Sequence, residues 1–140
     1  MLYHNPVISG FHPDPSITQK GDDFYVVTSS FEFFPGVPIF HSKNLVNWEQ
    51  IGYCLTNEKQ LNLKGIVASK GIYAPTIRFH NGLFYMITTI TDGEGGRKNI
   101  IVHTDEPEGE WSDPVACDWK GIDPSLFWDD DEKCYFYRDR

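Results

Sequence analysis

The chain has 140 residues, of which 40% are hydrophobic and 15% aromatic, so it can bury the core of one ordinary domain. Its 20 acidic residues outnumber its 12 basic ones, and the formal charge of −8 argues against a nucleic-acid or membrane partner. A neutral partner such as a sugar suits the many aromatic rings, although an aromatic-rich β core would use the same residues.

The cysteines and the N-terminus exclude several other classes of protein. Three cysteines are an odd number, and they form no Cys-x-x-Cys pair, so a disulfide framework or a zinc finger is not expected. We expect neither a metal site nor a cofactor. The N-terminus lacks the basic and long apolar segments of a secretory signal, and no apolar run reaches membrane-spanning length. These features favour a cytoplasmic protein.

Short runs of β-branched and aromatic residues dominate the chain and are separated by Gly, Asn, Asp and Pro. Helical periodicity is scarce, so the pattern predicts an all-β fold. Eight strands are expected in two groups of four, at residues 16–19, 24–29, 37–41 and 48–53, then 76–79, 83–89, 99–103 and 111–115.

The two groups of strands are copies of one unit, and a third copy begins near the end of the chain. Each copy starts with proline, a serine or threonine and an aliphatic residue; the prolines are Pro15, Pro75 and Pro124, which are 60 and then 49 residues apart. A four-stranded unit of about 50 residues is typical of a β-propeller blade, whereas a β-sandwich would lack the internal copy. Because a propeller needs about four to eight blades, we expect residues 1–140 to be the N-terminal part of a single propeller domain.

One carboxylate is held between two prolines, in the segment His12-Pro13-Asp14-Pro15-Ser16. The following proline disfavours the α region, so Asp14 is expected to be extended and to point in a defined direction. A simple turn in which Asp14 caps an amide would use the same residues. The repeat places Asp14, Ala74 and Asp123 at equivalent positions before innermost strands, which line a propeller axis. Two carboxylates from different blades are therefore expected to converge.

Two carboxylates in a polar, aromatic-walled pocket are the minimum equipment for glycoside hydrolysis, one as acid and one as base or nucleophile. On the residues alone, both roles fall to Asp14 and Asp123. The alternative is that Asp123 merely caps a repeated turn.

Four ordered segments span most of the chain: residues 5–16 (NPVISGFHPDPS), 31–38 (FEFFPGVP), 41–48 (HSKNLVNW) and 122–127 (IDPSLF). They resemble the β-xylosidases and α-L-arabinofuranosidases of glycoside hydrolase family 43. The resemblance implies a five-bladed β-propeller, of which this chain supplies about two blades and the start of a third. It also implies an exo-acting, inverting enzyme on xylan-derived oligosaccharides, without separating xylosidase from arabinofuranosidase.

The resemblance implies a different role for each carboxylate. Asp14 matches the general base, which deprotonates a water on the face of the sugar opposite the leaving group. Asp123 matches a third carboxylate that orients the general acid and raises its pKa. The acid is a glutamate further along the family's chain, and Glu132 is expected to be only a solvated hairpin tip. Residues 1–140 alone are therefore expected to be inactive.

The resemblance also implies the residues of the sugar pocket. Phe31 matches an aromatic wall of the terminal-sugar subsite, and Tyr73 stands where the family usually carries tryptophan. Tyr73 and its neighbour Ala74 are expected to contact substrate, and His12 to contact substrate or to position Asp14. Plain core packing of either aromatic ring is the alternative.

A competing interpretation is a non-catalytic carbohydrate-binding propeller or pseudoenzyme that holds the same sugars. In either case the expected partner is a xylo- or arabino-oligosaccharide. The unpaired edge of the partial third sheet favours association with a second copy.

Overall fold

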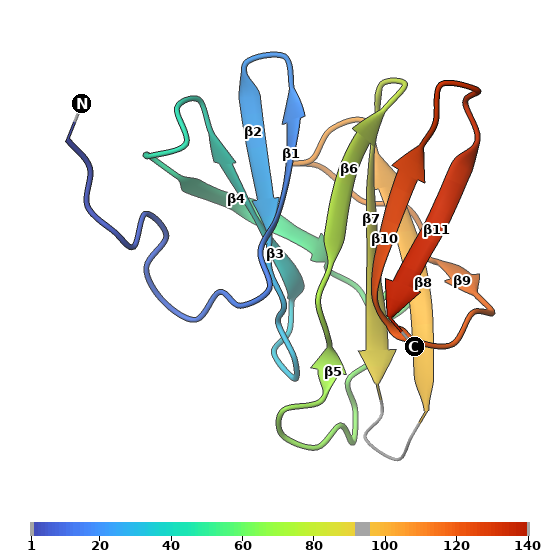
Figure 1. Cartoon of the computed structure of the whole chain (residues 1–140). Coiled ribbons are helices and arrows are strands. Elements are labelled where there is room, and N and C mark those ends of the chain that lie inside the picture. Colours follow the sequence, from blue (N-terminus) through green and yellow to red (C-terminus); the bar gives the residue numbers. More distant parts are fainter. Residues whose placement is uncertain (1, 92–95, 140) are drawn as a thin grey trace.

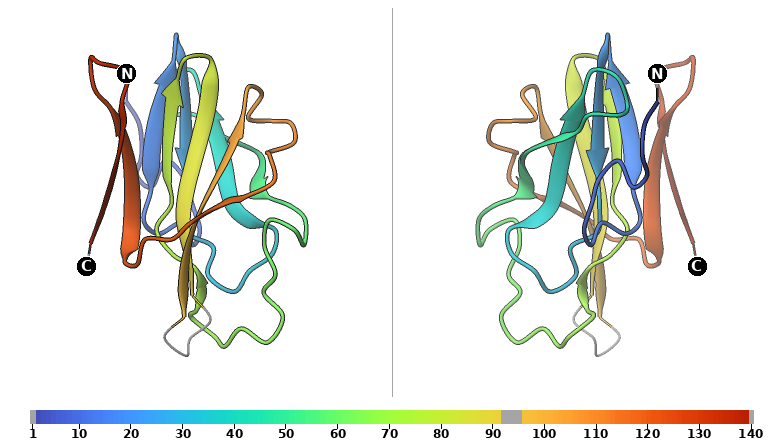
Figure 2. Two further views of the ribbon diagram at one scale, coloured as in Figure 1. Left: turned by 90° about the vertical axis from the view of Figure 1, so that its right-hand side faces the viewer. Right: turned by 90° about the vertical axis from the view of Figure 1, so that its left-hand side faces the viewer.

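The computed structural model describes residues 2–91 and 96–139, and every regular element within them is a β-strand (Figure 1), which confirms the all-β prediction. Within the same residues no helix is present that could cross a membrane. The strands form two large antiparallel sheets and one hairpin. The side views in Figure 2 show the hairpin at one margin of the molecule, beside the two sheets.

The first sheet has the strand order β1-β2-β3-β4, in which each strand pairs with the next along the chain. Its strands are β1 (Ser16–Lys20), β2 (Asp23–Val27), β3 (Gly36–Ser42) and β4 (Glu49–Leu55). In the second sheet, β7 pairs with β5, β6 and β8, and β8 pairs with β9. These strands are β5 (Gly71–Ile72), β6 (Thr76–His80), β7 (Leu83–Thr91), β8 (Arg97–Thr104) and β9 (Val115–Cys117). The hairpin consists of β10 (Ile122–Trp128) and β11 (Cys134–Asp139).

The register of the strands confirms the internal repeat. Ser16 pairs with Val27 in the first sheet, and Thr76 pairs with Ile87 at the matching place in the second. Outer pairs match as well: Tyr25 lies opposite His41, just as Tyr85 lies opposite His103, and in both pairs the rings approach each other. The two sheets are therefore successive blades, and β10–β11 is the first hairpin of the next.

The strands that begin each copy lie side by side (Figure 1). No backbone ladder joins β1 to β6; instead the backbone N–H of Ile77 donates to Ser16 Oγ (3.1 Å). Between β6 and β10, Arg78 donates from Nη2 to Ser125 Oγ (3.1 Å) and from Nε to the Leu126 carbonyl (3.2 Å). Side chains of one blade thus satisfy polar groups of its neighbour, and β1, β6 and β10 run in one direction along a common axis.

The eighth expected strand was placed wrongly. Residues 111–115 do not form a strand; β9 begins only at Val115 and has three residues. Trp111 is 5% exposed, and its indole N–H donates to the Pro107 carbonyl (3.4 Å). Beside it, the Ser112 N–H donates to the His103 carbonyl, and the His103 N–H donates to Ser112 Oγ instead of to a backbone carbonyl. The regular ladder therefore starts only after these residues. The two-residue strand β5 was not expected.

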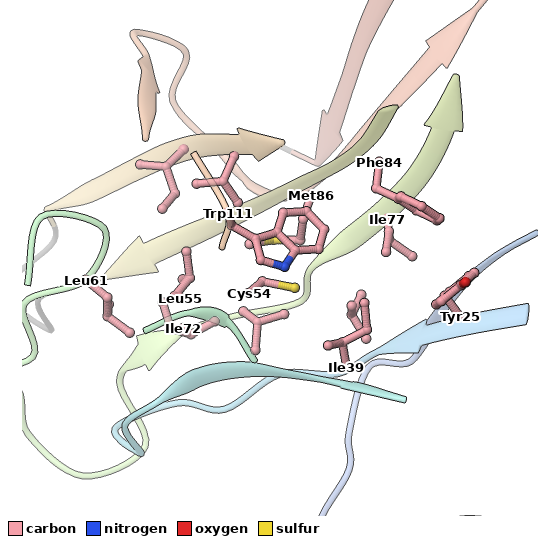
Figure 3. Packing of buried hydrophobic residues seen from close by; sticks show 14 residues of the cluster. Tyr25, Ile39, Cys54, Leu55, Leu61, Ile72, Ile77, Phe84, Met86 and Trp111 are labelled. Atoms are coloured by element: carbon pink, nitrogen blue, oxygen red, sulfur yellow. The ribbon is translucent and has the colours of Figure 1, made fainter. Parts of the chain in front are cut away.

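The hydrophobic core lies between the first two sheets (Figure 3). Ile39 and Leu55 of the first sheet pack towards Phe84 and Met86 of the second, with Trp111 among them. The buried carboxamide of Gln60 ties the sheets further: it accepts from the Thr56 N–H and donates to the Trp111 and Ser112 carbonyls. Both blades therefore share one core.

A two-residue bridge connects the blades at the end where each copy begins. Phe31 and Ile72 exchange backbone hydrogen bonds of 2.9 and 3.0 Å, although Phe31 lies in the β2–β3 loop of the first blade and Ile72 in β5 of the second. Gly71 precedes this bridge with φ +96°, and a Cβ there would lie 2.2 Å from the Phe31 carbonyl oxygen. The close approach of the two chains thus requires glycine at position 71.

We expect Gly71→Ala to destabilise the chain more than Gly82→Ala, measured as the free energy of unfolding in urea. Gly82 also has positive φ (+84°), but nothing lies within 4 Å of a Cβ there. Gly82→Ala therefore carries only the left-handed backbone cost of about 1–2 kcal/mol, whereas Gly71→Ala adds the backbone clash. Equal losses for the two variants would contradict the bridge as described.

Candidate active site

Asp14 lies just before β1 and has a left-handed backbone, with φ of 54°. The expected extended conformation is therefore wrong. Two hydrogen bonds hold the turn: the Ser29 N–H donates to the Pro13 carbonyl (3.0 Å), and Ser29 Oγ donates to Asp14 Oδ2 (2.6 Å). Aspartate is among the few residues that tolerate this region, and these contacts stabilise it. The carboxylate itself remains exposed.

Asp123 occupies the matching place within β10, in the register shift between Ile122 and Ser125, and its φ is also 54°. Asp123 is exposed, yet desolvation by the groups around it raises the pKa of its carboxyl, and the negative charges of Asp14 and Asp139 raise it further. A carboxylate affects another in this way only when both lie within electrostatic range. Asp14 and Asp123 therefore lie within electrostatic range of each other, and their convergence on one catalytic pocket stays a prediction.

Ala74 holds the same position before β6 and is half-buried. The middle blade therefore presents a methyl group where its neighbours present carboxylates. The equivalence of the three positions follows from the register, because Ser16, Thr76 and Ser125 each stand two residues later and each pairs with the following strand.

Aromatic rings form a row beside these positions. The ring centroids of Phe31 and Tyr73 are 5.9 Å apart, at an interplanar angle of 58°. Phe11 continues the row, 6.0 Å from Phe31, and its ring was not predicted from the sequence. Lys70 Nζ donates to the Tyr73 hydroxyl (3.3 Å), which gives this end of the row a polar edge. Phe31 and Tyr73 are each only partly buried, as rings that contact a sugar must be.

His12 packs beneath the turn. Its ring meets Phe40 edge to face, with centroids 4.9 Å apart. Its Nδ1 is buried without a hydrogen-bond partner among the described residues. The ring also lines a cavity of about 370 Å³ together with Ser29 and Ser30. These contacts favour support of the Asp14 turn, and substrate contact by His12 stays a prediction.

Ser29 was not predicted from the sequence, although it contacts Asp14 directly. It belongs to three consecutive hydroxyl residues, Thr28, Ser29 and Ser30, which are 1%, 1% and 6% exposed. The expected strand 24–29 ends at Val27, so these residues leave the ladder and turn into the site. A run of small hydroxyl residues directly after an apolar strand was the available signal.

Glu132 lies at the tip of the β10–β11 hairpin, at the opposite end of β10 from Asp123 (Figure 1). The expectation of a hairpin tip is confirmed. Its carboxylate is bound rather than simply solvated: His80 Nε2 lies 3.1 Å from Oε2, and Asn81 Nδ2 donates to the same oxygen (2.9 Å). Glu132 therefore contacts the turn of the neighbouring blade and takes no part in the site.

Propeller blades that direct carboxylates from two copies towards one aromatic-lined region are the arrangement expected of β-propeller glycoside hydrolases. The family model of glycosyl hydrolases family 43 matches residues 3–140. The chain belongs to this family.

Individual relatives agree with the family. A xylosidase/arabinosidase of Butyrivibrio fibrisolvens is 55% identical over 139 residues, which are 97% of this chain and 26% of the relative. A non-reducing end alpha-L-arabinofuranosidase of Bacteroides ovatus is 49% identical over 138 residues, covering 96% of this chain and 25% of the relative. The crystal structure of xylan beta-1,4-xylosidase from Bacillus halodurans C-125 superposes with a TM-score of 0.92 at 45% identity, covering 96% of this chain and 27% of that one.

These comparisons confirm the predicted fold. The solved family members are five-bladed β-propellers, and this chain supplies two blades and the first hairpin of a third. The chain spans about a quarter of the length of the curated relatives it matches.

The electrostatic contact between the two carboxylates can be measured. Asp14→Asn removes a negative charge that raises the pKa of Asp123, so Asp123 should ionise at lower pH in this variant, as followed by carboxyl ¹³C NMR. Asp22→Asn, which removes an exposed carboxylate in the β1–β2 turn, should leave the titration unchanged. An unaltered Asp123 titration in Asp14→Asn would place the two carboxylates in separate sites.

Proposed function

We propose that residues 1–140 form the N-terminal part of the catalytic propeller of an exo-acting glycosidase. Its substrates are xylan-derived oligosaccharides, from which it removes terminal xylose or L-arabinose with inversion. The observation that carries the proposal is the pair of carboxylates, Asp14 and Asp123, which stand at equivalent places in two blades and share a left-handed backbone. Relatives named for xylosidase and arabinosidase activities support the substrate class.

Asp14 acts in this proposal as the general base. Asp14 is exposed, and the hydrogen bond from Ser29 engages only Oδ2 of its carboxylate. The other oxygen, Oδ1, takes the proton of a water. That water forms a bond to the anomeric carbon while the bond to the leaving oxygen breaks, and a general acid returns a proton to the leaving oxygen.

Asp123 acts as a positioning residue for the general acid. A negative charge close to an acid disfavours its ionisation and keeps it protonated near neutral pH. The raised pKa of Asp123 itself fits a place where carboxyl groups gather and water is partly excluded.

The aromatic row supplies the walls of the sugar subsite. Pyranose and furanose rings present apolar C–H faces that pack on aromatic rings, and Phe31 and Tyr73 are partly exposed beside the two carboxylates. Ala74 lies next to Tyr73 and leaves room where a third carboxylate would stand. Xylose and arabinose are both pentoses, and either fits a small subsite of this kind.

Asp14→Asn should abolish turnover of an aryl xyloside or arabinofuranoside by the full propeller while leaving sugar binding intact. Loss of a general base lowers kcat by roughly 10²–10⁴-fold, whereas the amide keeps the size of the carboxyl group. Stopped assays measure turnover, and calorimetry with the free pentose measures binding.

Asp22→Asn is the matched control, because it removes an exposed carboxylate at the far end of β1, and it should behave as the wild type. Wild-type activity in Asp14→Asn would remove Asp14 from the role of base. Sugar binding without turnover in the unsubstituted propeller would instead identify a carbohydrate-binding propeller.

Residues 1–140 on their own should show no turnover of the same substrates. The only glutamate after Asp123 is Glu132, and its carboxylate is bound to the β6–β7 turn, away from the site. The purified chain should be assayed beside a longer family 43 enzyme. Comparable rates would show that these residues already contain a general acid.

A further inference from the structure

We propose that Ser29 is a positioning residue for Asp14, which fixes the orientation of the carboxylate and leaves Oδ1 to receive the proton of the attacking water. The inference rests on the proposed function, since it assigns a task to Ser29 only if Asp14 is the base. It concerns the same site and adds a residue that contacts the carboxylate at Oδ2.

Ser29 contacts the turn through both its backbone and its side chain. Its Oγ donates to Asp14 Oδ2 over 2.6 Å, a length typical of a strong hydroxyl–carboxylate hydrogen bond. Its N–H donates to the carbonyl of Pro13 over 3.0 Å. Ser29 is only 1% exposed, so its side chain is held by packing and cannot turn towards solvent. The carboxylate is therefore attached to a rigid group at one of its two oxygens.

Asp14 needs such a support because its own position is otherwise free. It is exposed, and the left-handed backbone at φ 54°, which aspartate tolerates, does not by itself orient the side chain. An exposed carboxylate without a partner samples several rotamers. A base must instead keep one oxygen within hydrogen-bond distance of the water during the reaction, and small displacements are costly to the rate.

The second blade provides an internal comparison. Val27 pairs with Ser16 in the first blade, and Ile87 pairs with Thr76 at the matching place in the second. Val27 and Ile87 are therefore equivalent. The residues two positions later, Ser29 and Thr89, are equivalent as well. Where Asp14 stands in the first blade, the second blade has Ala74, and the Thr89 hydroxyl donates instead to Asn99 Oδ1 (2.7 Å). A buried hydroxyl is thus common to both blades. This hydroxyl binds a carboxylate only in the first blade, where Asp14 is present. The contact is therefore not required to build a blade.

The test compares Ser29→Ala and Ser29→Thr with the wild type in the full propeller, using an aryl glycoside. Ser29→Ala should lower kcat by about 10–100-fold, the cost of a misplaced catalytic group, while KM stays nearly unchanged because no substrate contact is lost. Ser29→Thr keeps the hydroxyl and should restore most of kcat. If Ser29 served only in packing, Ser29→Ala would lower the stability of the protein without lowering kcat at unchanged KM.

Thr89→Val is the matched control. It removes the equivalent buried hydroxyl and its bond to Asn99, so it should lower the melting temperature and leave kcat unchanged. The decisive variant is the double substitution Asp14→Asn with Ser29→Ala. If Ser29 acts only through the carboxylate, it should be no less active than Asp14→Asn alone. This comparison holds even if the added methyl of Ser29→Thr prevents folding.

A normal kcat in Ser29→Ala would overturn the inference, and so would an effect on KM alone. An equal loss of kcat when Ser29→Ala is made in the wild type and in Asp14→Asn would overturn it as well. An inactive Asp14→Asn beside a fully active Ser29→Ala removes only the role of Ser29. A fully active Asp14→Asn removes the proposed function and the inference together.

Discussion

The structure depends on side-chain hydrogen bonds between neighbouring innermost strands. Ser16 and Thr18 of β1 accept hydrogen bonds from the backbone N–H groups of Ile77 and Phe79 in β6. The guanidinium of Arg78 in β6 donates in turn to the Ser125 hydroxyl and the Leu126 carbonyl of β10. Without a backbone ladder between blades, these bonds satisfy polar groups that would otherwise be buried without partners. They also align the starts of the strands, and that alignment carries Asp14 and Asp123 to one end of the axis.

The site combines a shared hydrophobic core with local backbone strain. Buried side chains from both sheets fill the space between the blades, and this packing stabilises the turns that present the carboxylates. Asp14 and Asp123 each hold a left-handed backbone, which costs free energy at each position. Desolvation of the Asp123 carboxylate has a further cost, which is seen as a raised pKa of that carboxyl. Because the blades are rigid, the fold tolerates both the left-handed backbone at these positions and the raised pKa of Asp123.

Much of this architecture could be predicted from the sequence, because the repeated segments can be recognised without knowing which residues are in contact. The recurring proline and hydroxyl residues located the copies, and the equivalent pairs Tyr25 with His41 and Tyr85 with His103 confirm them. The left-handed backbone of Asp14, the burial of Trp111 and the part played by Ser29 could not be predicted in the same way. Each depends on a partner distant in sequence, and local propensity carries no information about such a partner.

The backbone bridge between Phe31 and Ile72 has a consequence for how this site can change. Phe31 and Tyr73 come from different blades, yet the spacing of their rings is set by main-chain hydrogen bonds next to both of them. The frame of the pocket is therefore independent of which side chains fill it. Under the proposed function, exchange of the ring at position 73 would change the shape of the sugar pocket without redesign of either blade, so selectivity can diverge quickly on a scaffold that stays the same.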